Sequence, residues 1–195
     1  MTEEEFLVPL EKYLKVGLHI GTKFKTKYME PFIYKVRGDG LSVLNVQEIN
    51  KRLKIATKMM GRYEPDEILV VCRRENGWDA VNLFSKLTGV RAFAGRYPPG
   101  VLINSSLKNF VEVKLLIVCD PWPDKNAVKD AGKVGIPIIA LSDTNNTSNN
   151  VDLMIPCNNK GQKSLGLVFY ILTKEYLANK KLGELKATLE DFTED

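Results

Sequence analysis

The sequence has few of the residues from which metal sites and disulfide frameworks are built. It contains one histidine, His19, and three dispersed cysteines, Cys72, Cys119 and Cys157, with no CxxC pair. An odd number of separated cysteines argues against a disulfide framework and against a zinc cage. A single histidine in the apolar stretch GLHIG is more often a packed residue than a ligand or a base. We therefore expect core thiols and no metal or cofactor.

Long apolar runs are also absent. No stretch approaches the roughly 18 residues of a membrane span, and the acidic beginning, MTEEEFLVPLEKYL, lacks the basic region of a signal peptide. The 195 residues are 44% hydrophobic and 27% charged, which is typical of a globular chain. We expect a cytoplasmic protein without a membrane partner. A single domain is predicted over residues 1–180, with an acidic tail over 181–195 that frays from about Leu182.

The sequence does contain a regular alternation of strand-like and helix-like segments. Apolar runs such as ILVVC at 68–72 predict parallel strands that are buried on both faces. The predicted strands are 68–72, 90–95, 114–120, 136–143 and 151–156, and the predicted helices are 9–16, 47–63, 76–89, 125–135 and 158–180. A GDG turn at 38–40 predicts a hairpin between 32–37 and 41–46. The pattern predicts an α/β fold, a three-layer α/β/α sandwich around a mainly parallel sheet of about five strands.

Positive charge is concentrated near the start of the chain. Residues 21–62 hold ten basic and three acidic residues, although the whole chain carries a net charge of only +4. In the helix predicted at 47–63, one face carries the apolar residues Ile49, Leu53, Ala56, Met60 and Tyr63. The opposite side carries Lys51, Lys54, Lys58 and Arg62. Such a face favours a polyanionic partner, and an ordinary solvated surface is the alternative.

Further basic residues lie in predicted loops and turns. Arg73 and Arg74 follow a strand, and Arg96 stands beside Tyr97 in the loop GRYPPG, where an aromatic ring favours contact with unpaired bases. A helix start with two lysines is a candidate phosphate site. The predicted RNA-binding residues are Lys23, Lys25, Lys27, Lys35, Arg37, Lys51, Lys54, Lys58, Arg62, Arg73, Arg74, Arg96, Lys160 and Lys163.

A different chemistry is suggested by two aspartates. Asp120 and Asp143 end two successive predicted strands, where paired carboxylates are able to hold Mg²⁺ for phosphotransfer or nucleotide binding. The alternative is that both residues cap the turns that follow. The dinucleotide motif GxGxxG and the phosphate loop GxxxxGK[ST] are both missing, which weakens the enzyme interpretation.

Several long segments together resemble one family. They are GLHIGTKFKTKYMEPFIYKVRGDGLSVLNV, GRYPPGVLIN, LLIVCDP, GIPIIALSDTN and NVDLMIPCNNKGQKSLGL. They are similar to the universal family of small-subunit ribosomal protein number two, whose eukaryotic branch includes the laminin-receptor precursor. The resemblance covers about residues 7–178. Bacterial members insert a long helical hairpin where this chain has only SSLKNFVEV before Lys114, and the eukaryotic C-terminal extension is missing, so an archaeal source is expected.

The resemblance implies a flavodoxin-like (Rossmann-like) domain without catalysis, cofactor or small-molecule substrate. It implies a structural role in the small ribosomal subunit, between head and body, with small-subunit ribosomal RNA and neighbouring ribosomal proteins as partners. A protein-interaction module is a further alternative, by analogy with the laminin-receptor branch. The chain departs from the family in DPWPD at 120–124, where arginine usually follows DP, and in PGVLIN. Trp122 is therefore expected to stack or to pack against a protein neighbour.

Overall fold

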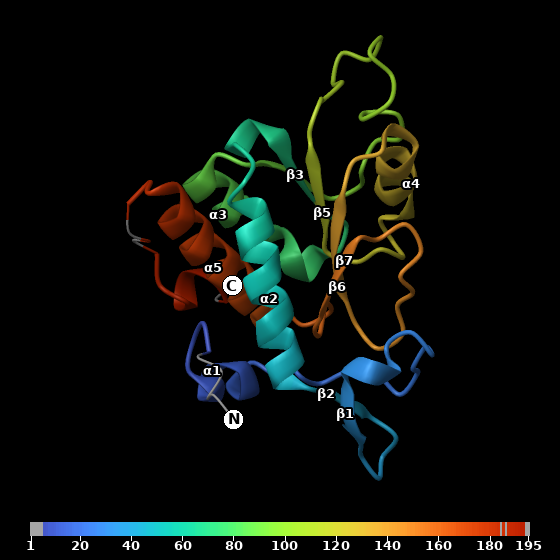
Figure 1. Ribbon diagram of the computed structural model, residues 1–195, viewed down its shortest axis with the longest axis vertical. Helices are drawn as coiled ribbons and strands as arrows, with labels where there is room; N and C mark the ends of the chain where they lie inside the picture. The colour runs from blue at the N-terminus through green and yellow to red at the C-terminus, as the bar shows by residue number, and fades with distance from the viewer. Residues whose placement is uncertain (1–5, 184, 186, 194–195) are drawn as a thin grey trace.

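The central element of the computed structural model, which describes residues 6–183, 185 and 187–193, is a parallel sheet (Figure 1). Its five strands are β3 (Ile68–Cys72), β4 (Arg91–Ala94), β5 (Leu115–Val118), β6 (Ile138–Ser142) and β7 (Leu153–Pro156). They are arranged in the order β4-β3-β5-β6-β7 and all neighbours are parallel. Counted within the sheet this is the order 2-1-3-4-5 of flavodoxin-like folds, which confirms the predicted fold class.

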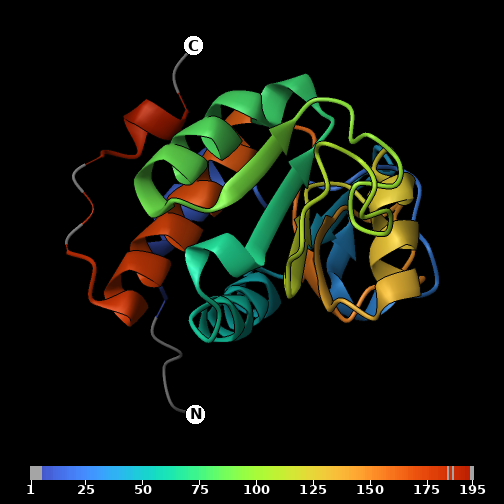
Figure 2. The ribbon, with the colours of Figure 1, turned by 90° about the horizontal axis from the view of Figure 1, so that it is seen from above.

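Helices cover both faces of the sheet. The helices α2 (Val46–Met60), α3 (Trp78–Thr88) and α5 (Gln162–Lys180) lie on one face, and α4 (Lys125–Val134) lies on the other (Figure 2). Alternate residues of β3 supply the two cores: Val70 packs toward α2, α3 and α5, whereas Val71 packs toward α4. The described part of the chain also contains four short 3₁₀ helices: η1 (Glu30–Phe32), η2 (Pro65–Glu67), η3 (Glu75–Gly77) and η4 (Glu190–Phe192). No helix in the described part of the chain combines the length and the apolar character that a membrane span requires.

The first part of the chain forms a short helix and a hairpin. Helix α1 (Leu10–Lys15) precedes β1 (Ile33–Val36) and β2 (Ser42–Leu44), which pair antiparallel as predicted. The hairpin forms the lower end of the molecule in Figure 1. Helix α2 begins after Asn45, whose side chain accepts a hydrogen bond from the Gln47 amide, and its last residue is Met60, so it is slightly shorter than predicted.

The basic segment 21–29 is fixed to the loop that follows β6. The Oγ1 atom of Thr144 accepts a hydrogen bond from the Thr22 amide at 3.0 Å and donates one to the Phe24 carbonyl at 2.9 Å. The Thr26 amide donates to the Thr144 carbonyl at 2.9 Å. Gly21 passes so close that a Cβ atom there would lie 2.5 Å from Thr144 Cγ2. These contacts hold a segment rich in lysine against the end of the sheet.

The end of the chain also packs on the domain. Phe192 is buried and its ring meets the ring of Tyr170 edge-on, with 5.9 Å between the ring centroids. Gly166 of α5 leaves the space that the Phe192 carbonyl occupies. The prediction that the chain frays from about Leu182 is therefore wrong for residues 189–193, because Phe192 is buried and Leu189 also packs against the core. Residues 184, 186, 194 and 195 of that prediction lie outside the described residues.

Candidate nucleic-acid interface

Many of the predicted RNA-binding residues meet where the parallel strands end. We use the name carboxyl edge for the loops and first helical turns that follow the five strands. Arg73 and Arg74 follow β3, Arg96 follows β4, and Lys160 and Lys163 follow β7. The segment with Lys23, Lys25 and Lys27 is fixed to the same edge through Thr144. Five strands spaced about 4.8 Å apart make this edge about 19 Å wide.

A second group of predicted residues lies on the outer face of α2. Lys51 and Lys58 are exposed and Lys54 is half-buried, whereas the apolar face with Leu53 and Met60 is buried against the core. The helix is about 22 Å long. Arg62 follows its last residue and is exposed near the start of β3, so it lies far from the carboxyl edge. Lys35 and Arg37 are exposed on the hairpin. The structure thus divides the predicted set between the carboxyl edge and the α2–hairpin side.

Most of these cations have weak partners or none. Three exposed ion pairs are present: Arg37 with Asp39 at 3.3 Å, Lys25 with Glu30 at 3.6 Å, and Lys51 with Glu48 at 3.8 Å. Exposed pairs of this kind are worth less than about 1 kcal/mol and compete poorly with a polyanion. Within the described residues, the predicted cations without an ion-pair partner include Lys23, Lys27, Lys35, Lys58, Arg62, Arg96 and Lys163.

Arg74 and Lys160 are different because each neutralises a buried carboxylate. Arg74 Nε donates to Asp120 Oδ2 at 2.8 Å, and Lys160 Nζ lies 2.7 Å from Asp143 Oδ2. Asp120 Oδ1 also accepts from the side-chain amide of Asn146 and from the Trp122 backbone amide, both at 3.0 Å. Both aspartates are about 1% exposed. Among the described residues no group of three acidic, histidine or cysteine side chains could hold a metal ion, so the magnesium interpretation has no support here.

The crevice in which this architecture usually binds ligands is closed by protein groups. Ligands of such folds bind where neighbouring strands send their connections to opposite faces of the sheet, which here is between β3 and β5. The Arg73 amide donates to Asp124 Oδ2 at 3.2 Å, and Arg73 Nη1 donates to the Pro123 carbonyl at 3.3 Å. Burial raises the pKa of Asp124 to about 7, and the nearby Asp120 carboxylate acts in the same direction. Together with the Arg74–Asp120 pair, these contacts tie the two loops to each other.

Two residues discussed in the sequence analysis, Tyr97 and His19, are enclosed by the protein rather than presented to a ligand. Tyr97 is buried, and its hydroxyl donates to Asp130 Oδ2 at 3.2 Å and accepts from the Leu102 amide. The prediction that this ring contacts bases is wrong, because the ring is buried. The burial could not be predicted from the neighbouring sequence, since the acidic partner Asp130 lies 33 residues away. His19 is half-buried, and its enclosed Nδ1 has no hydrogen-bond partner in the described structure.

The cysteines lie in the core, as predicted. Cys72, Cys119 and Cys157 are fully buried and unpaired. Burial raises the pKa of the Cys119 and Cys157 thiols above the ordinary value. Full burial shields all three from reagents, and among the described residues none of them belongs to a group that could hold a metal ion.

Sequence reasoning missed the residues that connect the loops. Asn146 donates to Asp120 and accepts hydrogen bonds from the Asp143 amide and from the side chain of Asn159. Thr144 joins the basic segment to the same loop. Both residues belong to the polar run TNNTSNN at 144–150, which by composition is an ordinary loop. The lysine spacing in KNAVKDAGK, which places Lys125 and Lys129 on one face of α4, was the available signal for a further basic site.

Comparison with known proteins gives a consistent result. Residues 107–178 match the family model described as Ribosomal protein S2. The small ribosomal subunit protein uS2 of Nanoarchaeum equitans is 48% identical over 190 residues, which cover 95% of this chain and 94% of that protein. The uS2 proteins of Picrophilus torridus and Pyrobaculum islandicum are 46% and 50% identical, covering 98% and 95% of this chain and 98% and 89% of their own lengths. These organisms are archaea, as the resemblance in the sequence implied.

Proposed function

Because this chain belongs to the ribosomal protein S2 family, we propose that it is a structural constituent of the small ribosomal subunit. Its partners are small-subunit ribosomal RNA and neighbouring ribosomal proteins, and it supports subunit assembly and translation in the cytoplasm. Identity of 46–50% to uS2 proteins over nearly the whole chain is the observation that carries this proposal. No observation favours the phosphotransfer alternative, since Asp120 and Asp143 are each neutralised by a basic side chain.

The basic residues fall into two groups, those that contact RNA phosphates and those that fix the loops of the carboxyl edge. The exposed cations of the α2–hairpin side and of segment 21–29 contact phosphates and release counterions, which supplies affinity without reading sequence. Arg73, Arg96 and Lys163 add phosphate contacts at the carboxyl edge. Arg74 and Lys160 act mainly by fixing the loops, because their charges are already matched by Asp120 and Asp143. In this proposal residues 1–180 form the RNA-binding domain. Residues 181–195 form an acidic tail that packs on α5 through Phe192 and turns the exposed side chains of Glu190 and Asp191 to protein or solvent.

Sedimentation of the full-length chain tests this function. A tagged copy is expressed in cells, and the lysate is fractionated on sucrose gradients in low and in high salt. We expect the protein to migrate with small subunits in low salt and to be released in high salt, because phosphate contacts weaken as counterions compete. A chain that stays in the soluble pool in both conditions overturns the ribosomal assignment.

A charge-reversal variant tests the α2 side separately. Lys51→Glu, Lys54→Glu and Lys58→Glu together are expected to lower incorporation into small subunits by about tenfold or more, since repulsion replaces three phosphate contacts. The matched control reverses three exposed lysines outside the proposed interface, at Lys86, Lys108 and Lys174. Equal incorporation of the two triple variants contradicts the role of α2, even if the wild-type chain migrates with the subunit.

A further inference from the structure

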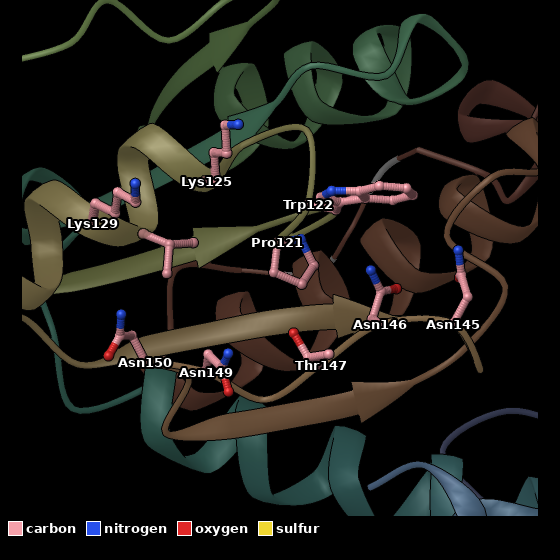
Figure 3. Close-up of a pocket in the computed structure, with 10 residues that line it drawn as sticks. Pro121, Trp122, Lys125, Lys129, Asn145, Asn146, Thr147, Asn149 and Asn150 are labelled. Carbon is pink, nitrogen blue, oxygen red and sulfur yellow. The ribbon is translucent and has the colours of Figure 1, made fainter. Parts of the chain in front are cut away.

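A pocket lies between the loop after β5, the first turns of α4 and the loop after β6. It has a volume of about 380 Å³, within the range of small-ligand sites. Figure 3 shows Trp122, Asn145 and Asn146 bordering one end of the pocket and Lys129 and Asn150 bordering the other. The lining residues come from α4 and from the loops after β5 and β6. Helix α4 and helix α2, which carries the basic face, lie on opposite sides of the sheet (Figure 2).

The indole of Trp122 is presented to solvent by a stiff loop. The residue is 70% exposed, which is unusual for so large an apolar side chain. Pro121 and Pro123 stand on either side of it and restrict the backbone. Its backbone amide donates to the buried Asp120 carboxylate at 3.0 Å, which fixes the position of the loop. An aromatic face held in this way is suited to stack on another flat ring.

The loop after β6 lines the pocket with amide and hydroxyl groups. They belong to Asn145, Asn146, Thr147, Asn149 and Asn150. Both ends of the Asn146 amide are bonded to protein groups, so this residue is a rigid floor. Asn149 and Asn150 are exposed, and their side chains have no hydrogen-bond partner among the described residues. Side-chain amides match the donor and acceptor pattern of nucleobase edges.

Two lysines give the pocket a positive charge. Lys125 and Lys129 line it from α4, and neither has a carboxylate partner in the described part of the chain. No carboxylate of the described residues lines the pocket. The nearby acids Asp120 and Asp124 are buried behind the loop and bonded to Arg74 and to the Arg73 amide. The free cations therefore favour an anionic ligand.

We propose that this pocket binds an unpaired nucleotide of RNA, with its base stacked on Trp122, its base edge toward the Asn149 and Asn150 amides, and phosphates at Lys125 and Lys129. An aromatic face, amide groups and unpaired cations in one pocket correspond to the base, the base edge and the phosphates of one nucleotide. The assignment rests on the proposed function, which makes RNA the partner. It extends the interface around the carboxyl edge to the face opposite α2.

Titration of the full-length chain with RNA tests the pocket. The probe is a labelled single-stranded oligoribonucleotide of about ten nucleotides, compared with a duplex of the same sequence. Affinity is read from the anisotropy of the labelled RNA, and stacking from tryptophan fluorescence, because Trp122 is the exposed member of the two tryptophans. Trp122→Ala is expected to weaken single-strand binding about 5- to 150-fold, the range of one lost base stack, and to leave duplex binding unchanged.

Two further variants make the test specific. Trp122→Phe keeps a stacking ring and is expected to recover most of the affinity while losing the fluorescence response. Lys125→Ala with Lys129→Ala is expected to weaken binding and to reduce its salt dependence. Lys133→Ala, an exposed lysine of the same helix outside the pocket, is the matched control and should bind like wild type.

Two results would reject the assignment of a nucleotide to this pocket and leave the proposed ribosomal function intact. Equal affinity of wild type and Trp122→Ala for the single strand contradicts the site, as does a wild-type chain that does not bind single-stranded RNA in low salt. If Trp122→Ala binds RNA normally but enters small subunits poorly, the indole contacts a protein and the nucleotide assignment is wrong. Failure of the proposed function is seen separately, as absence of the wild-type chain from small subunits on the gradient.

Discussion

At the scale of single residues, the carboxylates of the carboxyl edge differ in how their charge is compensated. Asp120 and Asp143 each face a basic side chain, whereas Asp124 receives one backbone hydrogen bond and its Oδ1 has no partner among the described residues. Burial is the largest cause that raises the pKa of Asp124, which reaches about 7. The folded chain therefore holds a proton that the unfolded chain releases near the ordinary carboxyl pKa of about 3.9.

This difference predicts how stability depends on pH. Since the folded state binds the extra proton between about pH 4 and 7, the contribution of Asp124 to the free energy of unfolding falls as the pH rises through that window. Between pH 5.5 and 8 the wild type should lose about 2 kcal/mol more than Asp124→Asn, as measured by urea unfolding. Asp79→Asn, at an exposed position, serves as the control and should keep the wild-type pH dependence. Identical pH profiles for wild type and Asp124→Asn would refute the buried proton.

The three cysteines predict a second property at this scale. Since Cys72, Cys119 and Cys157 are fully buried and burial raises the pKa of two of them, few thiolates reach a reagent in the folded state. Alkylation by iodoacetamide, followed by mass spectrometry, should leave all three unmodified in the native chain during the time in which a denatured sample reacts completely. Rapid modification of any one of them in the native chain shows that its strand end opens to solvent.

At the scale of elements, the sequence predicts well the helices and strands, because these depend on residues that are close along the chain. Continuous apolar runs predicted every strand of the sheet, because these strands are buried on both faces. Apolar residues three and four apart predicted the buried face of α2. Contacts between distant residues were not predictable in this way. The Thr22–Thr144 hydrogen bond spans 122 residues, and the docking of Phe192 depends on the space at Gly166.

The C-terminal contact can be tested by filling that space. In Gly166→Ala the new methyl group overlaps with the Phe192 carbonyl, so residues 190–193 have to leave the surface of α5. Loss of the buried Phe192 ring is expected to lower the free energy of unfolding by about 2 kcal/mol and to expose the segment to limited proteolysis. Gly132→Ala in α4 has no neighbour closer than 3.9 Å and is the control, with an expected gain of up to about 1 kcal/mol. If the segment resists protease equally in both variants, the packing of Phe192 is not what holds it.

At the scale of the whole molecule, the net charge of +4 conceals how the charge is distributed. Basic residues lie along α2, on the hairpin and over the carboxyl edge, so most RNA contacts are expected on one side and one edge of the sandwich. The pocket at α4 adds one proposed contact on the opposite face. The sequence itself shows that the basic residues cluster in residues 21–62. It does not show which cations are free and which are neutralised, because the partners of Arg74 and Lys160 are 46 and 17 residues away.

The distribution predicts the salt dependence of RNA binding by the whole chain. Replacing Lys51, Lys54 and Lys58 by glutamine should lower the slope of log affinity against log salt by about 2 to 3, since each lost phosphate contact removes about 0.7 to 0.9. Filter binding to small-subunit ribosomal RNA over a series of KCl concentrations measures this slope. The same replacements at Lys86, Lys108 and Lys174 should leave it unchanged. A slope that is equal in the two variants excludes α2 from the phosphate contacts.

The attachment of segment 21–29 to Thr144 also limits when this segment can fold during synthesis of the chain. The lysines of this segment emerge early, whereas Thr144 and Asn146, to which Thr22, Phe24 and Thr26 bind, are made about 120 residues later. A contact over such a distance cannot form until the intervening strands have been synthesised and paired. Gly21 and Thr22 are able to pair with Ser42 early. The contacts that hold the three lysines against the sheet are thus among the last to form, and until then the nascent chain carries these lysines without their final support.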